Sequence, residues 1–166
     1  MQLIFLFETN SSNKSDYKYI RSYILNSDMD RKFKFSPIYL NGKGNYSKYE
    51  NKIKALIKSY QGKSKVIMFI DVDSTSLNYD QIKLNEEIIN YCDKNNYELV
   101  WFKRTIEEVF WGKKIPQNMK RVKADEFLRS NKILEINLNS LNKVSYNSLK
   151  NGESNLKFIL DKYKTL

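Results

Sequence analysis

The sequence of 166 residues is long enough to bury a core, and its hydrophobic share of 41% is typical of a folded domain. Its 29 Lys and Arg residues exceed its 19 Asp and Glu residues, and the net charge of +10 favours a polyanionic partner such as nucleic acid. One cysteine and no histidine exclude disulfides within the chain, cysteine–zinc sites and histidine-based catalysis, so any chemistry would use carboxylates, lysines, hydroxyls or a hard metal.

Strands and helices alternate along the first part of the chain. Residues 2–8 (QLIFLFE) predict a buried strand, and residues 16–25 predict a helix with Ser15 as its cap. Residues 34–41 (KFSPIYLN) predict a second strand, in which Pro37 argues against a central, fully paired position.

The alternation continues through residue 112. Residues 47–60 predict a helix, residues 64–73 a buried strand, residues 79–94 a helix and residues 97–104 a fourth strand. A short helix over residues 105–112 follows and ends at its glycine. We therefore predict an α/β fold: an open sheet of about four mostly parallel strands with helices on both faces.

The last third of the sequence has a less regular pattern. Residues 133–138 (ILEINL) predict a fifth strand, and residues 146–164 contain a closing helix. We interpret residues 1–112 as the α/β core and residues 113–166 as a basic C-terminal extension packed on the same single domain.

Acidic residues follow two of the predicted strands. Glu8 ends the first strand and Asp71 and Asp73 end the third, where strand alternation turns Val72 into the core. Ligands of open α/β sheets bind at the carboxyl ends of the strands, and clustered carboxylates repel one another unless a cation neutralises them. Oxygen ligands without His or Cys favour Mg²⁺ or Mn²⁺. The alternative is that these acids only cap the loops and helices that follow the strands.

Four stretches resemble the RloB-like branch of the Toprim superfamily, near the Toprim nucleases of the OLD family. They are FLFETNSSNKSDYKYI, LNGKGNYSKYENKIKAL, VIMFIDVDSTSLNYDQIKLNEEI and YELVWFKRTIEEVFWG, and the resemblance covers about residues 2–112. It implies a Toprim-like fold whose metal-dependent site cuts nucleic acid, in a bacterial or phage defence system whose partner is an ATPase.

The resemblance also implies roles for individual acids. Glu8 corresponds to the Toprim glutamate, a general acid or base and metal partner, and Asp71 and Asp73 correspond to the metal-binding pair. Asp16 would be a second acid after the glutamate, and Glu107 the acid of the later motif. The family usually has Gly directly after the first glutamate, whereas Thr9 stands here.

Basic residues follow the fourth strand. Lys103 ends that strand beside the expected metal edge, where we expect it to take part in catalysis. We expect the following residues to contact nucleic-acid phosphates: Lys43, Arg104, Lys113, Lys114, Lys120, Arg121 and Lys123.

The sequence thus predicts a Mg²⁺-dependent nuclease that hydrolyses phosphodiester bonds of DNA or RNA. One alternative, favoured by Thr9, is a catalytically weak module that grips nucleic acid or a partner ATPase. Another is a phosphatase, because FIDVDSTSL also resembles the first motif of haloacid-dehalogenase-type enzymes, although that motif normally opens the chain.

We expect a cytoplasmic protein without membrane contact. The opening MQLIFLF is short and lacks the basic start of a signal peptide. No apolar run approaches the ~20 residues that a membrane span needs.

Overall fold

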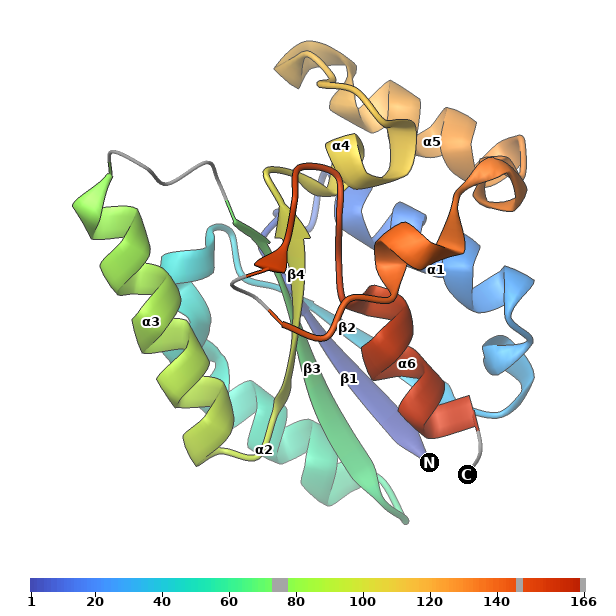
Figure 1. The fold of residues 1–166 in the computed structure, drawn as a ribbon. Helices are drawn as coiled ribbons and strands as arrows, with labels where there is room; N and C mark the ends of the chain where they lie inside the picture. Colours follow the sequence, from blue (N-terminus) through green and yellow to red (C-terminus); the bar gives the residue numbers. More distant parts are fainter. Residues whose placement is uncertain (73–77, 146–147, 165–166) are drawn as a thin grey trace.

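A parallel four-stranded sheet forms the centre of the molecule in the computed structural model, which describes residues 1–72, 78–145 and 148–164 (Figure 1). The strands are β1 (Gln2–Phe7), β2 (Lys34–Tyr39), β3 (Ser64–Val72) and β4 (Glu98–Lys103). Their order is β2-β1-β3-β4, and each neighbouring pair is parallel. The α/β fold with an open parallel sheet, expected from the sequence, is therefore confirmed.

The burial of each strand follows its place in the sheet. All six residues of β1 are buried, and β3 carries the unbroken apolar run from Val66 to Ile70 that a strand covered on both faces requires. Pro37 has no N–H to donate and lies in β2, which is an edge strand, as its presence in the sequence predicted.

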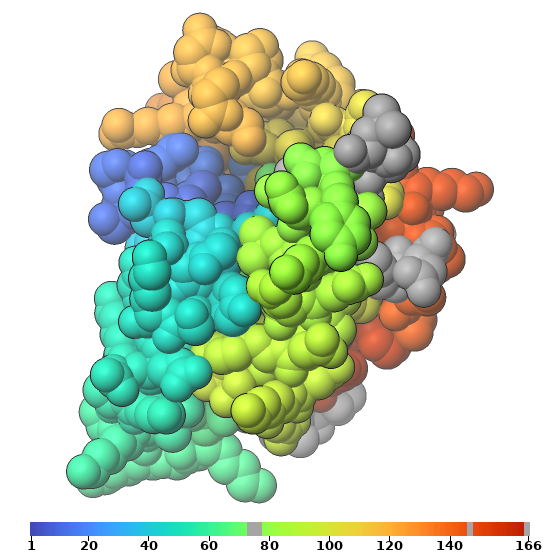
Figure 2. All heavy atoms as spheres, turned by 90° about the vertical axis from the view of Figure 1, so that its left-hand side faces the viewer, coloured from blue at the N-terminus to red at the C-terminus, as the bar shows by residue number. Residues whose placement is uncertain are grey.

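Helices cover both faces of the sheet (Figure 1). One face carries α1 (Ser15–Asn26), α4 (Ile106–Trp111), α5 (Lys120–Arg129) and α6 (Leu156–Lys164). The other face carries α2 (Glu50–Ser59) and α3 (Tyr79–Lys94), and Figure 2 shows these two helices from outside. Short 3-10 helices are η1 (Met29–Arg31), η2 (Lys43–Tyr49), η3 (Gln117–Met119), η4 (Lys132–Glu135) and η5 (Leu138–Leu141).

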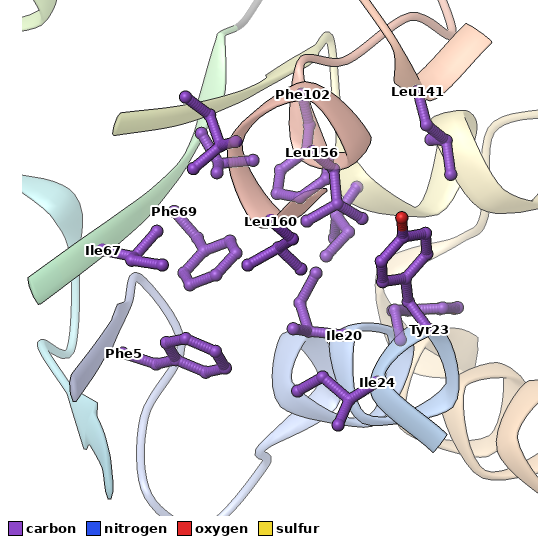
Figure 3. Close-up of a cluster of buried hydrophobic side chains, with 14 of the residues drawn as sticks. Phe5, Ile20, Tyr23, Ile24, Ile67, Phe69, Phe102, Leu141, Leu156 and Leu160 are labelled. Atoms are coloured by element: carbon purple, nitrogen blue, oxygen red, sulfur yellow. The ribbon is translucent and has the colours of Figure 1, made fainter. Parts of the chain in front are cut away.

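Strand alternation divides the core into two layers. Phe5 and Phe69 point to the α1 face, where their ring centroids lie 5.0 Å apart, whereas Leu6 points to the α2 and α3 face. Figure 3 shows Leu156 and Leu160 of the closing helix packed beside Phe69 and α1. The C-terminal extension therefore contributes to the same buried layer as the first strand.

The expected fifth strand at residues 133–138 is wrong, since η4 covers the first half of that range and η5 begins at Leu138. The free edge of β4 is instead covered by a later segment. Asn155 Oδ1 accepts the Trp101 N–H at 2.8 Å, Asn155 Nδ2 donates to the Leu99 carbonyl at 2.9 Å, and Ser154 forms an isolated bridge with Phe102. Because these groups already satisfy the edge, the segment at 133–138 turns Ile133 into the core and forms no ladder.

Two other details differ from the sequence predictions. Ser15 is the first residue of α1 and does not cap it: the capping position is Lys14, at φ 53, without a side-chain bond. The helix α5 was not predicted.

Gly112 ends α4 as expected, at φ 68, and its N–H donates to the Glu108 carbonyl at 2.9 Å. Among the helices of the described ranges, none has the length and apolar character needed to cross a membrane.

Candidate functional site

A cavity of about 340 Å³ lies at the carboxyl ends of the two central strands. We call it the acidic cavity, because four carboxylates and two ammonium groups line it: Glu8, Asp16, Asp71, Glu107, Lys43 and Lys120. Thr9, Asn13, Ser15, Gly42, Thr105 and Gln117 complete its wall. Glu8, Asp16, Asp71 and Glu107 therefore line one cavity at this edge of the sheet.

The two central strands bring the first pair of acids together. Glu8 directly follows β1, and its carbonyl accepts the Gly42 N–H at 2.7 Å, which fixes the loop after β2 against it. Asp71 shares the α1 face with Phe69, while Val72 between the two aspartates is buried on the other face, as alternation predicts. Asp73 lies outside the described residues, so the structure describes only one member of the expected pair.

The beginnings of two helices supply the other two acids. Asp16 lies in the first turn of α1, where the Ser15 hydroxyl donates to its Oδ1 at 3.3 Å. Glu107 lies in the first turn of α4, and the N–H of Ile106 beside it donates to Asp71 Oδ1 at 2.8 Å. Acids are favoured in first helical turns, because the free N–H groups there carry partial positive charge.

Burial and mutual repulsion perturb the carboxylates. Burial raises the pKa of Asp71 well above its ordinary value, and the charges of Glu8, Asp16 and Glu107 raise it further. Burial also raises the pKa of Asp16 to about 7, and the charge of Glu107 adds to the effect. A cation in the cavity would oppose both shifts, because it stabilises the ionised form.

Two lysines provide positive charge within the cavity wall. Lys120 Nζ lies 3.1 Å from Glu107 Oε2, and the Glu107 side chain is only 1% exposed. Burial lowers the pKa of Lys120, but Glu107, Asp71 and Asp16 outweigh it, so the net shift is upward and the ammonium stays charged. Lys43 Nζ donates to the Asp71 carbonyl at 2.9 Å and thereby holds the end of β3.

The donor set suits a hard divalent cation. It contains carboxylates, Asn and Thr oxygens but no sulfur or imidazole, the combination that Mg²⁺ and Mn²⁺ prefer. Within the described ranges, the Thr9 hydroxyl and the Asn13 amide oxygen are buried there without a hydrogen-bond partner. The described acids surround the cavity without converging on one point, and no three of them form a metal-binding group.

The expected catalytic Lys103 is not in the acidic cavity. It pairs with Val72 in the sheet register, so alternation directs it to the α2 and α3 face, opposite Asp71. Arg104 also turns away: at φ 70 its N–H donates to the Val72 carbonyl, and its guanidinium pairs with Glu108 at 3.2 Å. Lys103 and Arg104 therefore lie near the end of β4 but point away from the acidic cavity.

A second cavity, of about 750 Å³, lies on the other side of α4. We call it the basic cavity, because its lining includes Arg104, Lys113, Lys114 and Lys132. Consecutive residues of α4 divide the two cavities, since Glu107 lines the acidic one and Glu108 the basic one.

Two further cations expected to bind nucleic acid lie outside both cavities. Lys123 pairs with Glu126 at 2.6 Å and lies over the Trp111 ring, while Arg121 is exposed on α5. Sequence reasoning missed Asn13, because nothing distinguishes it within the polar loop TNSSNKS, and it missed Lys132, whose segment was expected to lead into a strand.

No family model matches the chain, and neither a curated protein nor a solved structure matches it. The fold and the cavity therefore define only a class: an α/β domain with a parallel sheet and an acidic cavity at the carboxyl edge of that sheet.

Proposed function

We propose that this protein is a Mg²⁺- or Mn²⁺-dependent nuclease of the Toprim type that hydrolyses phosphodiester bonds of DNA or RNA. The observation that carries the proposal is the gathering of Glu8, Asp16, Asp71 and Glu107 around one cavity at the carboxyl edge of a parallel sheet. Four buried or half-buried carboxylates in one cavity repel one another, and the two lysines of its wall offset only part of that charge, so binding a cation is the simplest reason to keep them.

Glu8, Asp71 and Asp73 would hold the ion in this proposal, with Asp16 and Glu107 of the same cavity as additional ligands. When bound, the metal would polarise the scissile phosphate and activate a water molecule. The chain's own contribution is positioning: Lys43 and the Ile106 N–H fix Asp71 from two sides, through its carbonyl and its carboxylate.

The basic cavity supports nucleic acid as the substrate. Lys113 and Lys114 are exposed there, and within the described residues neither forms an ion pair. A strand passing over α4 would have one phosphate at the acidic cavity and neighbouring phosphates at the basic one, where each neutralised phosphate releases counterions. The net charge of +10 is consistent with such a polyanionic partner.

Two observations favour a second candidate, a nucleic-acid- or ATPase-binding module of low catalytic activity. Thr9 follows Glu8 where a glycine would let a phosphate approach the backbone, and the Lys120 ammonium already occupies part of the cavity wall. Such a module would grip its partner in the same defence setting without cutting it.

Cleavage assays distinguish the two. The purified chain is incubated with Mg²⁺ or Mn²⁺ and single- or double-stranded DNA or RNA, alongside Asp71→Asn. Loss of about 100-fold or more in rate for Asp71→Asn supports the nuclease. Glu86→Gln, an exposed acid on α3, is the matched control and should cut at the original rate. Equal cleavage by Asp71→Asn would remove the acidic cavity from the mechanism, and binding without cleavage by the original chain would favour the module.

A further inference from the structure

Lys120 belongs to the C-terminal extension and yet lies among the acids of the core. It is the first residue of α5, and its side chain is 22% exposed. Glu8 follows β1, Asp16 lies on α1, Asp71 lies on β3, and Glu107 lies on α4. A lysine of the extension thus lines a cavity whose four described acids all belong to residues 1–112.

Tertiary packing fixes the position of α5. Lys18 on α1 pairs with Asp125 on α5 at 2.7 Å. The ring of Phe127 on α5 lies 5.1 Å from that of Tyr19 and 5.3 Å from that of Phe110. Because the helix is anchored against both α1 and α4, Lys120 is held at the cavity and is not a free surface lysine.

The acidic cavity keeps a surplus of acids even with this lysine in place. Among the described residues, four carboxylates face the ammonium groups of Lys43 and Lys120. When all six groups are ionised, these described residues leave a net charge of −2, which one divalent cation would neutralise. Without Lys120, Glu107 would be a carboxylate that is 1% exposed and has lost its ion-pair partner, which proteins rarely tolerate.

We propose that Lys120 is a built-in cation of the acidic cavity: it neutralises Glu107 and Asp16 in place of a second metal ion and so limits the cavity to one divalent cation. The inference rests on the proposed metal-dependent function. It adds that the cavity binds one ion and that Lys120 sets this limit. It also gives the C-terminal extension a role in the site itself.

Metal titration of the full chain tests the proposal. Mn²⁺ alone is titrated into the chelator-treated original chain, Lys120→Met and Arg121→Met, and bound ions are counted by calorimetry and by Mn²⁺ paramagnetic resonance. We expect one ion per chain for the original and for Arg121→Met, which removes one exposed charge from the same helix. Lys120→Met should bind two ions, because Glu107 and Asp16 become available as ligands.

A stability measurement without metal accompanies the titration. In chelator, Lys120→Met should melt roughly 6 °C or more below Arg121→Met, since it leaves a buried charge unpaired, and Mn²⁺ should restore most of the loss. If Lys120→Met does not fold, two other variants replace it. Glu107→Gln/Lys120→Met removes both members of the ion pair, so it should fold and bind one ion. Lys120→Arg keeps the positive charge and should also bind one ion.

The outcomes separate the two proposals. One ion of unchanged affinity in both the original chain and Lys120→Met would overturn the role of Lys120 while leaving the metal site intact. If only Lys120→Met binds an ion, the role of Lys120 as a built-in cation is supported, but the proposal that the original chain is a metal-dependent nuclease is overturned. Binding by none of the folded variants would overturn both.

Discussion

The metal-free protein should lose stability as the pH rises, because Asp16 is easier to protonate in the folded state. Its pKa is raised from 3.8 to about 7 by burial and by the charge of Glu107. A carboxyl whose folded pKa is raised contributes stability that is complete below the unfolded pKa and is lost as the pH passes through the folded one. The loss from this group therefore falls between about pH 4 and about pH 7.

The magnitude follows from the number of pH units involved. Between pH 5 and about pH 7 the unfolded carboxyl is ionised while the folded one is protonated, and each unit costs about 1.36 kcal/mol. Asp16 alone should thus lower the free energy of unfolding by about 3 kcal/mol between pH 5 and pH 8. Asp71, whose pKa is also raised by burial and by the neighbouring acids, adds to the loss in the same direction.

Urea unfolding in chelator at pH 5 and pH 8 measures this difference. Asp16→Asn should show a pH dependence smaller than that of the original chain by about 3 kcal/mol, whereas Asp80→Asn, an exposed acid on α3, should leave it unchanged. Excess Mg²⁺ should flatten the dependence of the original chain, because an ion favours the ionised carboxylates. An identical pH dependence in Asp16→Asn and the original chain would refute the electrostatic account of the cavity.

Two further predictions concern the extension and the basic cavity. Asn155→Ala leaves two backbone groups of β4 without partners and should cost about 2–4 kcal/mol in urea unfolding; a loss under ~0.5 kcal/mol would mean that water replaces the amide. Lys113→Gln/Lys114→Gln should reduce the salt slope of duplex DNA binding by about 1–2 relative to Lys52→Gln/Lys58→Gln on α2, and equal slopes would exclude the basic cavity from the contact.

Sequence reasoning succeeded where periodicity and strand order decide the structure. The apolar run of β3 and the alternation around Val72 predicted a doubly covered strand with Asp71 on one face, because side-chain direction in a strand has a period of two. The same rule, applied to β4, directs Lys103 away from Asp71, because Lys103 pairs with Val72; its position near the end of the strand does not decide which way it points.

Where the sequence failed, the deciding contacts were distant in the chain. Apolar and polar residues alternate at 134–138 as in a strand, but the Asn155 side chain forms the hydrogen bonds at the edge of β4. No local sequence pattern predicts this contact. Lys120 is one of many lysines in a polar stretch, and α5 buries only Ala124 and Phe127, too few for a clear helical period. Both placements depend on tertiary packing.

These placements together change what the C-terminal extension does for the site. The first 112 residues supply all four described carboxylates of the acidic cavity but, of its two lysines, only Lys43. The extension supplies Lys120 at the acidic cavity, and Lys132 with two exposed lysines at the basic one. Residues 1–112 do not complete the acidic cavity alone, because the ion-pair partner of the buried Glu107 comes from the extension. Variation in the extension should therefore alter metal affinity as well as stability.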